Sequence, residues 1–326
     1  MTWLLDTELR THGITGHVIG NERIYTRTLV LWAVGMHIDI EKIWLEAPVR
    51  DHQNNLVTEV DTKKVGVTKF PATTTPVIRM MCRNGQYKGT IAKRMNAVAF
   101  KSVLSMDIQY ADMMPNVKIS ARNTIQITGC CSFELLKHIL MFFVSDQMAC
   151  GFTMHDAHEA GFIIDIVLSN LFFRLSGRVE RNEVCKAFQT LNHPTTVACY
   201  EPLTRDPSVT IKMFDKKLPH NDEIYIRWFY SEQQPSHWQS MSYKDVRRLL
   251  PIRSPQEPSI LCTTFRVFGS GSVVQVGRWP SCMLRDKQII DNILQSITKK
   301  NNTTGRIYSS RQTKIPKTWF NKKTNQ

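Results

Sequence analysis

The sequence predicts an α+β protein made of two similar halves that share one sheet. The chain has 326 residues, enough for one large domain or two of ordinary size. Two stretches, NVKISARNTIQITGC (116–130) and FRVFGSGSVVQVG (265–277), each read as strand, turn and strand, followed by a helical pattern. The elements before each hairpin also come in a similar order, which indicates an internal duplication. Two copies are too few for a solenoid, so a pseudo-symmetric pair sharing one sheet fits better.

The first half opens with an apolar extended run at Leu29–Val34, which Gly35 breaks. Asp39 can cap a short helix, and Pro48 stops it. Residues 75–82 are expected to form a strand. Residues 102–110 alternate apolar and polar side chains, which is typical of a half-exposed strand.

The first hairpin follows directly. Asn123 can occupy the left-handed position of its turn at low cost, and Gly129 ends its second strand. Ser132 can then cap a helix, because apolar residues recur at helical spacing from Phe133 to Phe143.

The second half repeats this order. Residues 162–175 form a long extended run, and residues 181–191 predict a short amphipathic helix. Strands are expected at 208–214 and 223–230. The second hairpin turns at the Gly-Ser-Gly of 269–271, and the helix after Ser281 has one apolar face.

In these places the chain resembles the TATA-box-binding protein family, particularly its divergent relatives in large DNA viruses. Both hairpins look like that family's strand, turn and glycine-terminated strand, and the second keeps the Ser-Gly turn. LVLWAVGMHIDIEKIWLEA (29–47) is similar to the family's first strand and following helix. The likeness covers most of residues 27–297.

The resemblance implies a saddle, in which a curved antiparallel sheet carries helices on its convex side. The concave side would sit on the DNA minor groove, with Phe side chains wedged between base steps. The expected division is an N-terminal extension (1–26), a first repeat (27–150), a second repeat (151–297) and a basic, mostly disordered tail (298–326).

Residue by residue, the resemblance places a wedge at Phe268 and two groove-facing side chains behind it, Val274 and Val276. The corresponding positions of the first hairpin are Ser120, Gln126 and Thr128. Ser120 offers almost no apolar area and cannot unstack a base step. Outside the family reading, Phe268 would be a core residue beside a glycine turn, and Gln126 and Thr128 ordinary exposed strand residues.

The central strands carry the family's other contacts. Leu29 and Val167 are expected to face the groove. The family's central Asn falls on Arg27 in the first half and on Asp165 in the second, unless the alignment shifts by one residue. Arg27 would suit a narrow A·T-rich groove, whereas Asp165 would bring an acceptor-only group against base acceptors.

The charge distribution points to a polyanion. The net charge is +14, and the last 28 residues contribute eight cations and no acid. These cations are Lys299, Lys300, Arg306, Arg311, Lys314, Lys317, Lys322 and Lys323. Such a tail binds nucleic acid through counterion release; the alternative is a solubilising extension.

Motifs for catalysis are missing from the sequence. There is no Walker-type or GxGxxG loop, and His155 and His158 have no visible third metal ligand. The eight cysteines are scattered without a CxxC pair, which favours reduced thiols inside a cell. We therefore expect no enzyme activity, cofactor, small-molecule substrate, signal peptide or membrane span.

The leading hypothesis is a TATA-binding-protein-like transcription initiation factor of viral type that binds duplex, A·T-rich DNA. The resemblance implies a transcription factor IIB-like protein and RNA polymerase as partners. It places the protein in the host nucleus, a cytoplasmic viral factory or the virion. One alternative is a non-catalytic protein-interaction or virion component that keeps the saddle but has lost TATA recognition. Another is an accessory domain of a nucleic-acid enzyme.

Overall fold

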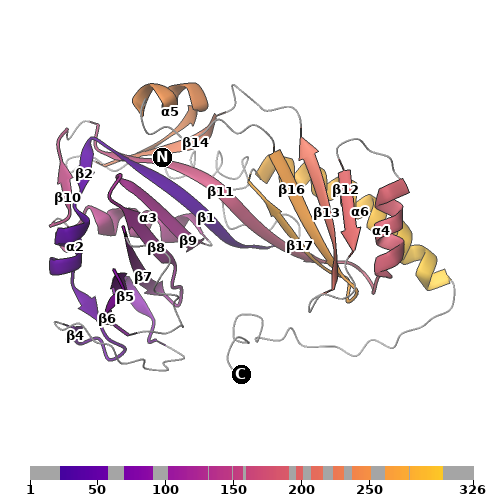
Figure 1. Cartoon of the computed structure of the whole chain (residues 1–326), viewed down its shortest axis with the longest axis horizontal. Helices are drawn as coiled ribbons and strands as arrows, with labels where there is room; N and C mark the ends of the chain where they lie inside the picture. Colours follow the sequence, from indigo (N-terminus) through magenta and orange to yellow (C-terminus); the bar gives the residue numbers. More distant parts are fainter. Residues whose placement is uncertain are drawn as a thin grey trace.

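The computed structural model describes residues 23–57, 70–90, 102–130, 132–148, 150–156, 159–190, 196–200, 207–215, 223–230, 237–250, 261–278 and 280–303. Within these ranges the fold is α+β, with one large, mostly antiparallel open sheet and five helices (Figure 1). The helices are α2 (Ile40–Glu46), α3 (Phe133–Phe143), α4 (Arg181–Thr190), α5 (Tyr243–Leu249) and α6 (Pro280–Thr303).

The strands fall into an earlier and a later group. The earlier strands are β1 (Arg23–Val34), β2 (Met36–Ile38), β3 (Val49–Arg50), β4 (Leu56–Val57), β5 (Thr73–Arg83), β6 (Gln86–Gly89), β7 (Val103–Ala111), β8 (Asn116–Ser120), β9 (Thr124–Cys130) and β10 (Phe152–Met154). The later strands are β11 (Gly161–Arg174), β12 (Thr196–Tyr200), β13 (Ser208–Asp215), β14 (Glu223–Phe229), β15 (His237–Ser242), β16 (Leu261–Phe268) and β17 (Ser272–Gly277). All of them except β2 and β10, which form a separate two-stranded sheet, belong to the large sheet.

The long strands β1 and β11 pair antiparallel at the centre of this sheet. Outward from β1 the order is β9, β8, β7, β5; outward from β11 it is β17, β16, β13, β12. Strand β14 pairs with the first part of β11 and with β15, whereas β17 pairs with the last part of β11. The central strand β11 therefore exchanges one neighbour for another along its length.

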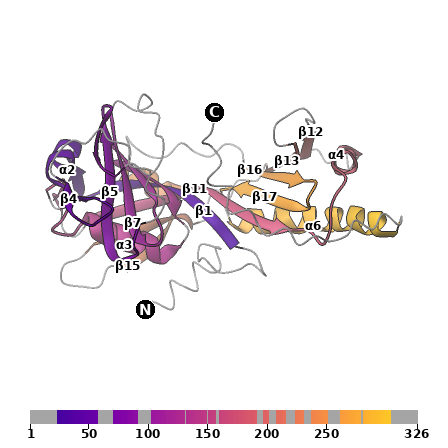
Figure 2. The same cartoon turned by 90° about the horizontal axis from the view of Figure 1, so that it is seen from below.

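The helices that pack on the sheet define two cores on the same face. One core lies beneath α2 and α3 and includes Leu29 and Leu31 of β1. The other lies beneath α4 and α6 and includes Leu171 and Phe173 of β11. Figure 2 shows α6 running along one side of β16 and β17. In the following, the opposite side of the sheet is called the open face.

Local sequence explains why several elements begin where they do. The Asp39 side chain caps α2 by accepting bonds from two backbone amides, and the Ser132 hydroxyl caps α3 by accepting from Leu135 N. Asn123 adopts φ 56°, as predicted for the hairpin turn. At Gly35, with φ +64°, a Cβ would come within 2.8 Å of Ala160 N, so the bend after β1 requires glycine.

Most predicted elements are confirmed, but their assignment differs in the second half. Strand β12 was not predicted, and it takes the outer place beside β13. The segment expected as a strand at 223–230 exists as β14, but it joins β15 and α5 instead of the outer sheet. Strand β15 and helix α5, which make up the rest of this excursion between β13 and β16, were not predicted.

The predicted boundaries also need adjustment. Strand β1 begins at Arg23, before both the expected run at Leu29–Val34 and the expected start of the first repeat at residue 27. Strand β10, placed in the second half by sequence, pairs with β2 of the first. Helix α6 continues to Thr303, so residues 298–303 belong to a helix and not to a disordered tail. No helix in the described ranges is both long and apolar enough to cross a membrane.

Candidate nucleic-acid interface

The open face of the second half is built from two cross-strand rows. The first row joins Phe172, Val274, Arg266 and Thr210 on neighbouring strands. The second row joins Asn170, Val276, Thr264 and Lys212. Their chain neighbours Leu171, Val273, Phe265 and Ile211 are buried beneath the helices. Because strand side chains alternate between faces, both rows point away from α4 and α6.

These rows are basic and contain no acidic residue. Arg266 and Lys212 are exposed, while Val274 and Val276 are half-buried. Arg266 Nε donates to Ser208 Oγ at 3.3 Å, and its guanidinium carbon lies 5.7 Å from the centre of the Phe268 ring. This geometry leaves the guanidinium at the surface with some of its donors directed along the sheet.

Phe268 lies on this same face, at the end of β16. Its neighbours Phe265 and Val267 belong to the core, but Phe268 is half-buried and does not. The turn that follows is fixed, since Leu175 N donates to Gly271 O and Val179 N donates to Gly269 O. The ring therefore stands at the edge of the basic rows and not under the helices.

The first half presents a more polar face. Ser120, Gln126 and Thr128 alternate with buried residues of β8 and β9, which places all three on the open face. Gln126 lies between Val30 and Lys118 in cross-strand register. Thr128 is exposed and lies opposite Thr28 and Asn116. No aromatic side chain occupies the place that corresponds to Phe268.

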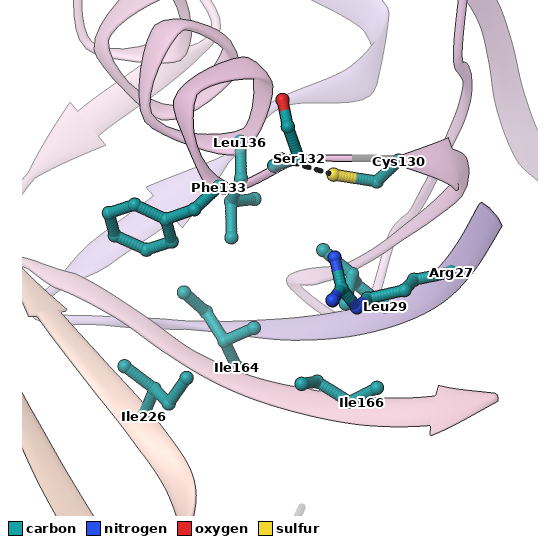
Figure 3. Close-up of a pocket in the computed structure, with 9 residues that line it drawn as sticks. All are labelled: Arg27, Leu29, Cys130, Ser132, Phe133, Leu136, Ile164, Ile166 and Ile226. Atoms are coloured by element: carbon teal, nitrogen blue, oxygen red, sulfur yellow. Dashed lines mark hydrogen bonds between the residues drawn. The ribbon is translucent and has the colours of Figure 1, made fainter. Parts of the chain in front are cut away.

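Arg27 and Leu29 do not lie on the open face. Both are only 2% exposed, and Figure 3 shows them pointing toward the start of α3. They line a small pocket of about 10 Å³ together with Cys130, Ser132, Phe133, Leu136, Ile164, Ile166 and Ile226. The expectation that these two side chains face a groove is therefore wrong.

The alternation along β1 is unbroken: Arg27, Leu29 and Leu31 are buried, whereas Thr28 and Val30 are half-buried. The register shifts between Arg27 and Thr28 against β9, and between Thr28 and Leu29 against β11. Thr28 itself lies opposite exposed Thr128 and so takes the open-face position. In β11 the same shift leaves Val167 half-buried and without a direct partner in β1.

Asn170 is the functional candidate that the sequence reading missed. It lies opposite Val276, one residue before Gly277, just as Thr28 lies opposite Thr128, one residue before Gly129. Asn170 is half-buried and belongs to the basic rows. The place of its partner Val276, one residue before the strand-ending Gly277, is the sequence signal that could have identified Asn170.

Asp165 lies inside the protein instead of at a DNA-binding surface. Its side chain is 3% exposed and accepts a bond from Arg278 Nη2 at 2.6 Å. Burial raises the pKa of Asp165, and the Arg278 charge opposes this. The pair lies close to Tyr225 of β14, whose pKa is raised mainly by burial and also by Asp165. The Asp165–Arg278 pair therefore lies at the point along β11 where the neighbouring strand changes from β14 to β17.

Part of the open face of the first half is covered by the chain itself. Trp32 and Ile163 of the central strands are buried against Tyr225, Met241, Val246 and Leu250. Val30 and Val34 pack against the edge of the same cluster. These partners come from β14, β15, α5 and the residue after it, and Figure 1 shows α5 above the upper end of β1. The covering segment is called the cap (residues 223–230 and 237–250).

The remaining predicted positions are only partly described. Lys299 and Lys300 lie in α6, while the other six tail cations and His158 lie outside the described residues. Among the residues that are described, no three His, Cys, Asp or Glu side chains come together as a metal site. No known protein family matches the sequence, and no significantly similar curated protein was found.

Proposed function

We propose that this chain is a non-catalytic protein that binds duplex DNA with the open face of a TATA-binding-protein-like saddle. The observation that carries the proposal is the sheet order: the central strand, last strand, hairpin partner and outer strands follow in the same sequence on both sides. Two copies of one strand–helix unit, related by a pseudo-twofold axis between β1 and β11, account for this order.

Contacts at the hairpin turns support the duplication. In the first half, Asn123 O accepts from Ala33 N, and Asn123 Oδ1 accepts from Ile38 N at 3.1 Å. In the second half, Gly271 O accepts from Leu175 N at 2.9 Å. In each half, a carbonyl of the hairpin turn thus accepts a hydrogen bond from the end of the central strand or the residue after it. Two unrelated hairpins would not be expected to share this arrangement.

The composition of the basic rows favours DNA as the ligand. Arg266 and Lys212 can neutralise backbone phosphates, and Asn170 supplies both a donor and an acceptor for base edges. Val274 and Val276 offer the apolar surface that a minor groove tolerates, and Phe268 is placed at their edge as a wedge. We therefore assign the principal contact to the second half and a weaker, more polar one to Gln126 and Thr128.

The resemblance extends this proposal to transcription initiation at A·T-rich sites, with a transcription factor IIB-like protein and RNA polymerase as partners. A second candidate is a protein-binding or virion role. The cap favours it, because Trp32 and Val30 lie under α5, where a saddle that used both halves equally would contact DNA. Ser120 also favours it, since it cannot act as a wedge.

A charge-reversal pair separates these functions. Arg266→Glu with Lys212→Glu should weaken binding to a fluorescent 30-base-pair A·T-rich duplex at least about tenfold. It should also lower the slope of log K against log salt by about 2, because two phosphate contacts are lost. The matched control is Lys42→Glu with Lys186→Glu, two exposed cations of the helix-covered side.

The control pair should retain most of the affinity of the unmodified protein. Equal losses in both pairs would indicate unspecific attraction by net charge. A protein that does not bind duplex DNA at low salt, or whose binding is unaffected by the open-face pair, would fit the protein-binding role instead.

A further inference from the structure

The cap ends in a short basic helix whose position is fixed by its own packing. Ser242 and Asp245 form a capping box, in which Asp245 N donates to Ser242 Oγ at 3.3 Å and Ser242 N donates to Asp245 Oδ2. Val246 is fully buried and Leu250 is 9% exposed in the cluster around Trp32. Helix α5 is therefore attached to the central strands by core contacts.

Three cations occupy the outer surface of this helix. Lys244, Arg247 and Arg248 are all exposed. Residues three and four apart lie on the same side of a helix, so these three form one group opposite Val246. The capping-box hydrogen bonds from Ser242 lower the pKa of Asp245, and the charges of Arg248 and Lys244 lower it further. Asp245 is thus a neighbouring acid of these cations, but the capping box already occupies its carboxylate.

The cap also sits on the same side of the sheet as the basic rows. Trp32 lies opposite Thr124, and Val30 lies opposite Gln126, both on the open face. Residues that pair across antiparallel strands point to the same side. This side is continuous from β1 into β11, because buried Arg27 lies opposite buried Ser169 on the other face. A rod-like polyanion that rests on Arg266 and Lys212 and extends across the centre thus meets the cap.

We propose that Lys244, Arg247 and Arg248 are a second contact for the sugar-phosphate backbone of the duplex held by the basic rows. The inference rests on the proposed DNA binding. Under it, the first half does not insert Val30 or Trp32 into a groove, and the duplex crosses over α5. Flexible exposed cations on a rigid helix suit phosphates, which need charge and no base-specific geometry.

The test is a triple substitution, Lys244→Gln, Arg247→Gln and Arg248→Gln. Glutamine is a good helix former, so α5 should persist, and an unchanged thermal midpoint confirms it. With the full chain and the same 30-base-pair duplex, the salt slope should fall by about 2–3, close to 0.9 for each lost contact. Affinity should fall by the same factor for A·T-rich and G·C-rich duplexes.

The control is Lys42→Gln, Lys137→Gln and Lys186→Gln, which removes the same charge from α2, α3 and α4 on the helix-covered side. Its salt slope should change by less than about 1. If the α5 triple variant shows the same salt slope as this control, the inference about α5 is overturned. DNA binding by the open face would still be supported if the variant Arg266→Glu with Lys212→Glu loses affinity. If the unmodified protein does not bind duplex DNA, both proposals fail together.

Discussion

Replacing Arg278 by Met should destabilise the protein in a strongly pH-dependent way. Arg278 is the ion-pair partner of Asp165, with 2.6 Å between Nη2 and Oδ2, and the two side chains are 21% and 3% exposed. Removing one member of a buried pair leaves the other charge uncompensated, which costs about 3–5 kcal/mol. Because Arg278 is partly exposed, we expect the lower end, about 3 kcal/mol, at neutral pH.

The sign of the pH dependence follows from the pKa of Asp165. Burial already raises it above the ordinary value, and Arg278 opposes that rise. Without the guanidinium, the pKa of Asp165 in the folded protein rises further, while its pKa in the unfolded chain stays at about 3.9. A group with a raised folded pKa loses its stabilising effect as the pH rises through that pKa. The deficit of Arg278→Met should therefore be largest near pH 7.5 and smaller at pH 5.

Urea unfolding followed by tryptophan fluorescence can measure this deficit, since Trp32 and Trp228 are buried. The double variant Asp165→Asn with Arg278→Met removes both charges and should regain about half of the lost stability at pH 7.5. An equal deficit at both pH values, or a double variant no more stable than the single one, would show that the carboxylate does not carry the effect.

Two further outcomes concern DNA. Phe268→Ala should reduce DNA bending, read by energy transfer between dyes on the duplex ends, and weaken binding by about 1–3 kcal/mol. Ser120→Ala should change neither, so equal effects of the two variants would exclude a wedge at Phe268. Deleting residues 304–326 should flatten the salt dependence and weaken binding to all sequences alike; an unchanged slope would mean that this segment does not contact DNA.

Local patterns were sufficient to predict the hairpins and the capped helices. Alternation in β8 and β9, Asn123 in the turn and Ser132 before α3 each act over a few residues, and the fold keeps them. The face of the central strand could not be predicted in this way. A period of two fixes which residues share a side but not which side, and β1 turns Arg27 and Leu29 toward α3. Only the strand partners decide it.

The cap was beyond the reach of the sequence for a related reason. Helix α5 has seven residues and buries Val246 alone among them, which is too little for a periodic signal. The capping box of Ser242 and Asp245 was the one local sign of its start. Its packing partners, Trp32 and Ile163, lie far away along the chain, so their meeting depends on the sheet being assembled first.

Under the proposed duplication, a comparison of matching positions accounts for the difference between the two halves of the open face. Trp32 lies opposite Thr124, and its counterpart Arg174 lies opposite Ser272, at the same step of each hairpin. An aromatic side chain buries about 150–250 Å², worth about 4–6 kcal/mol at roughly 25 cal/mol per Å². The cap supplies this burial for Trp32, which is 8% exposed. Arg174 is exposed and charged, so this position gives a covering helix no aromatic side chain to bury. The difference between Trp32 and Arg174 thus favours a covered first half and an open, basic second half, which is the half to which the proposal assigns DNA.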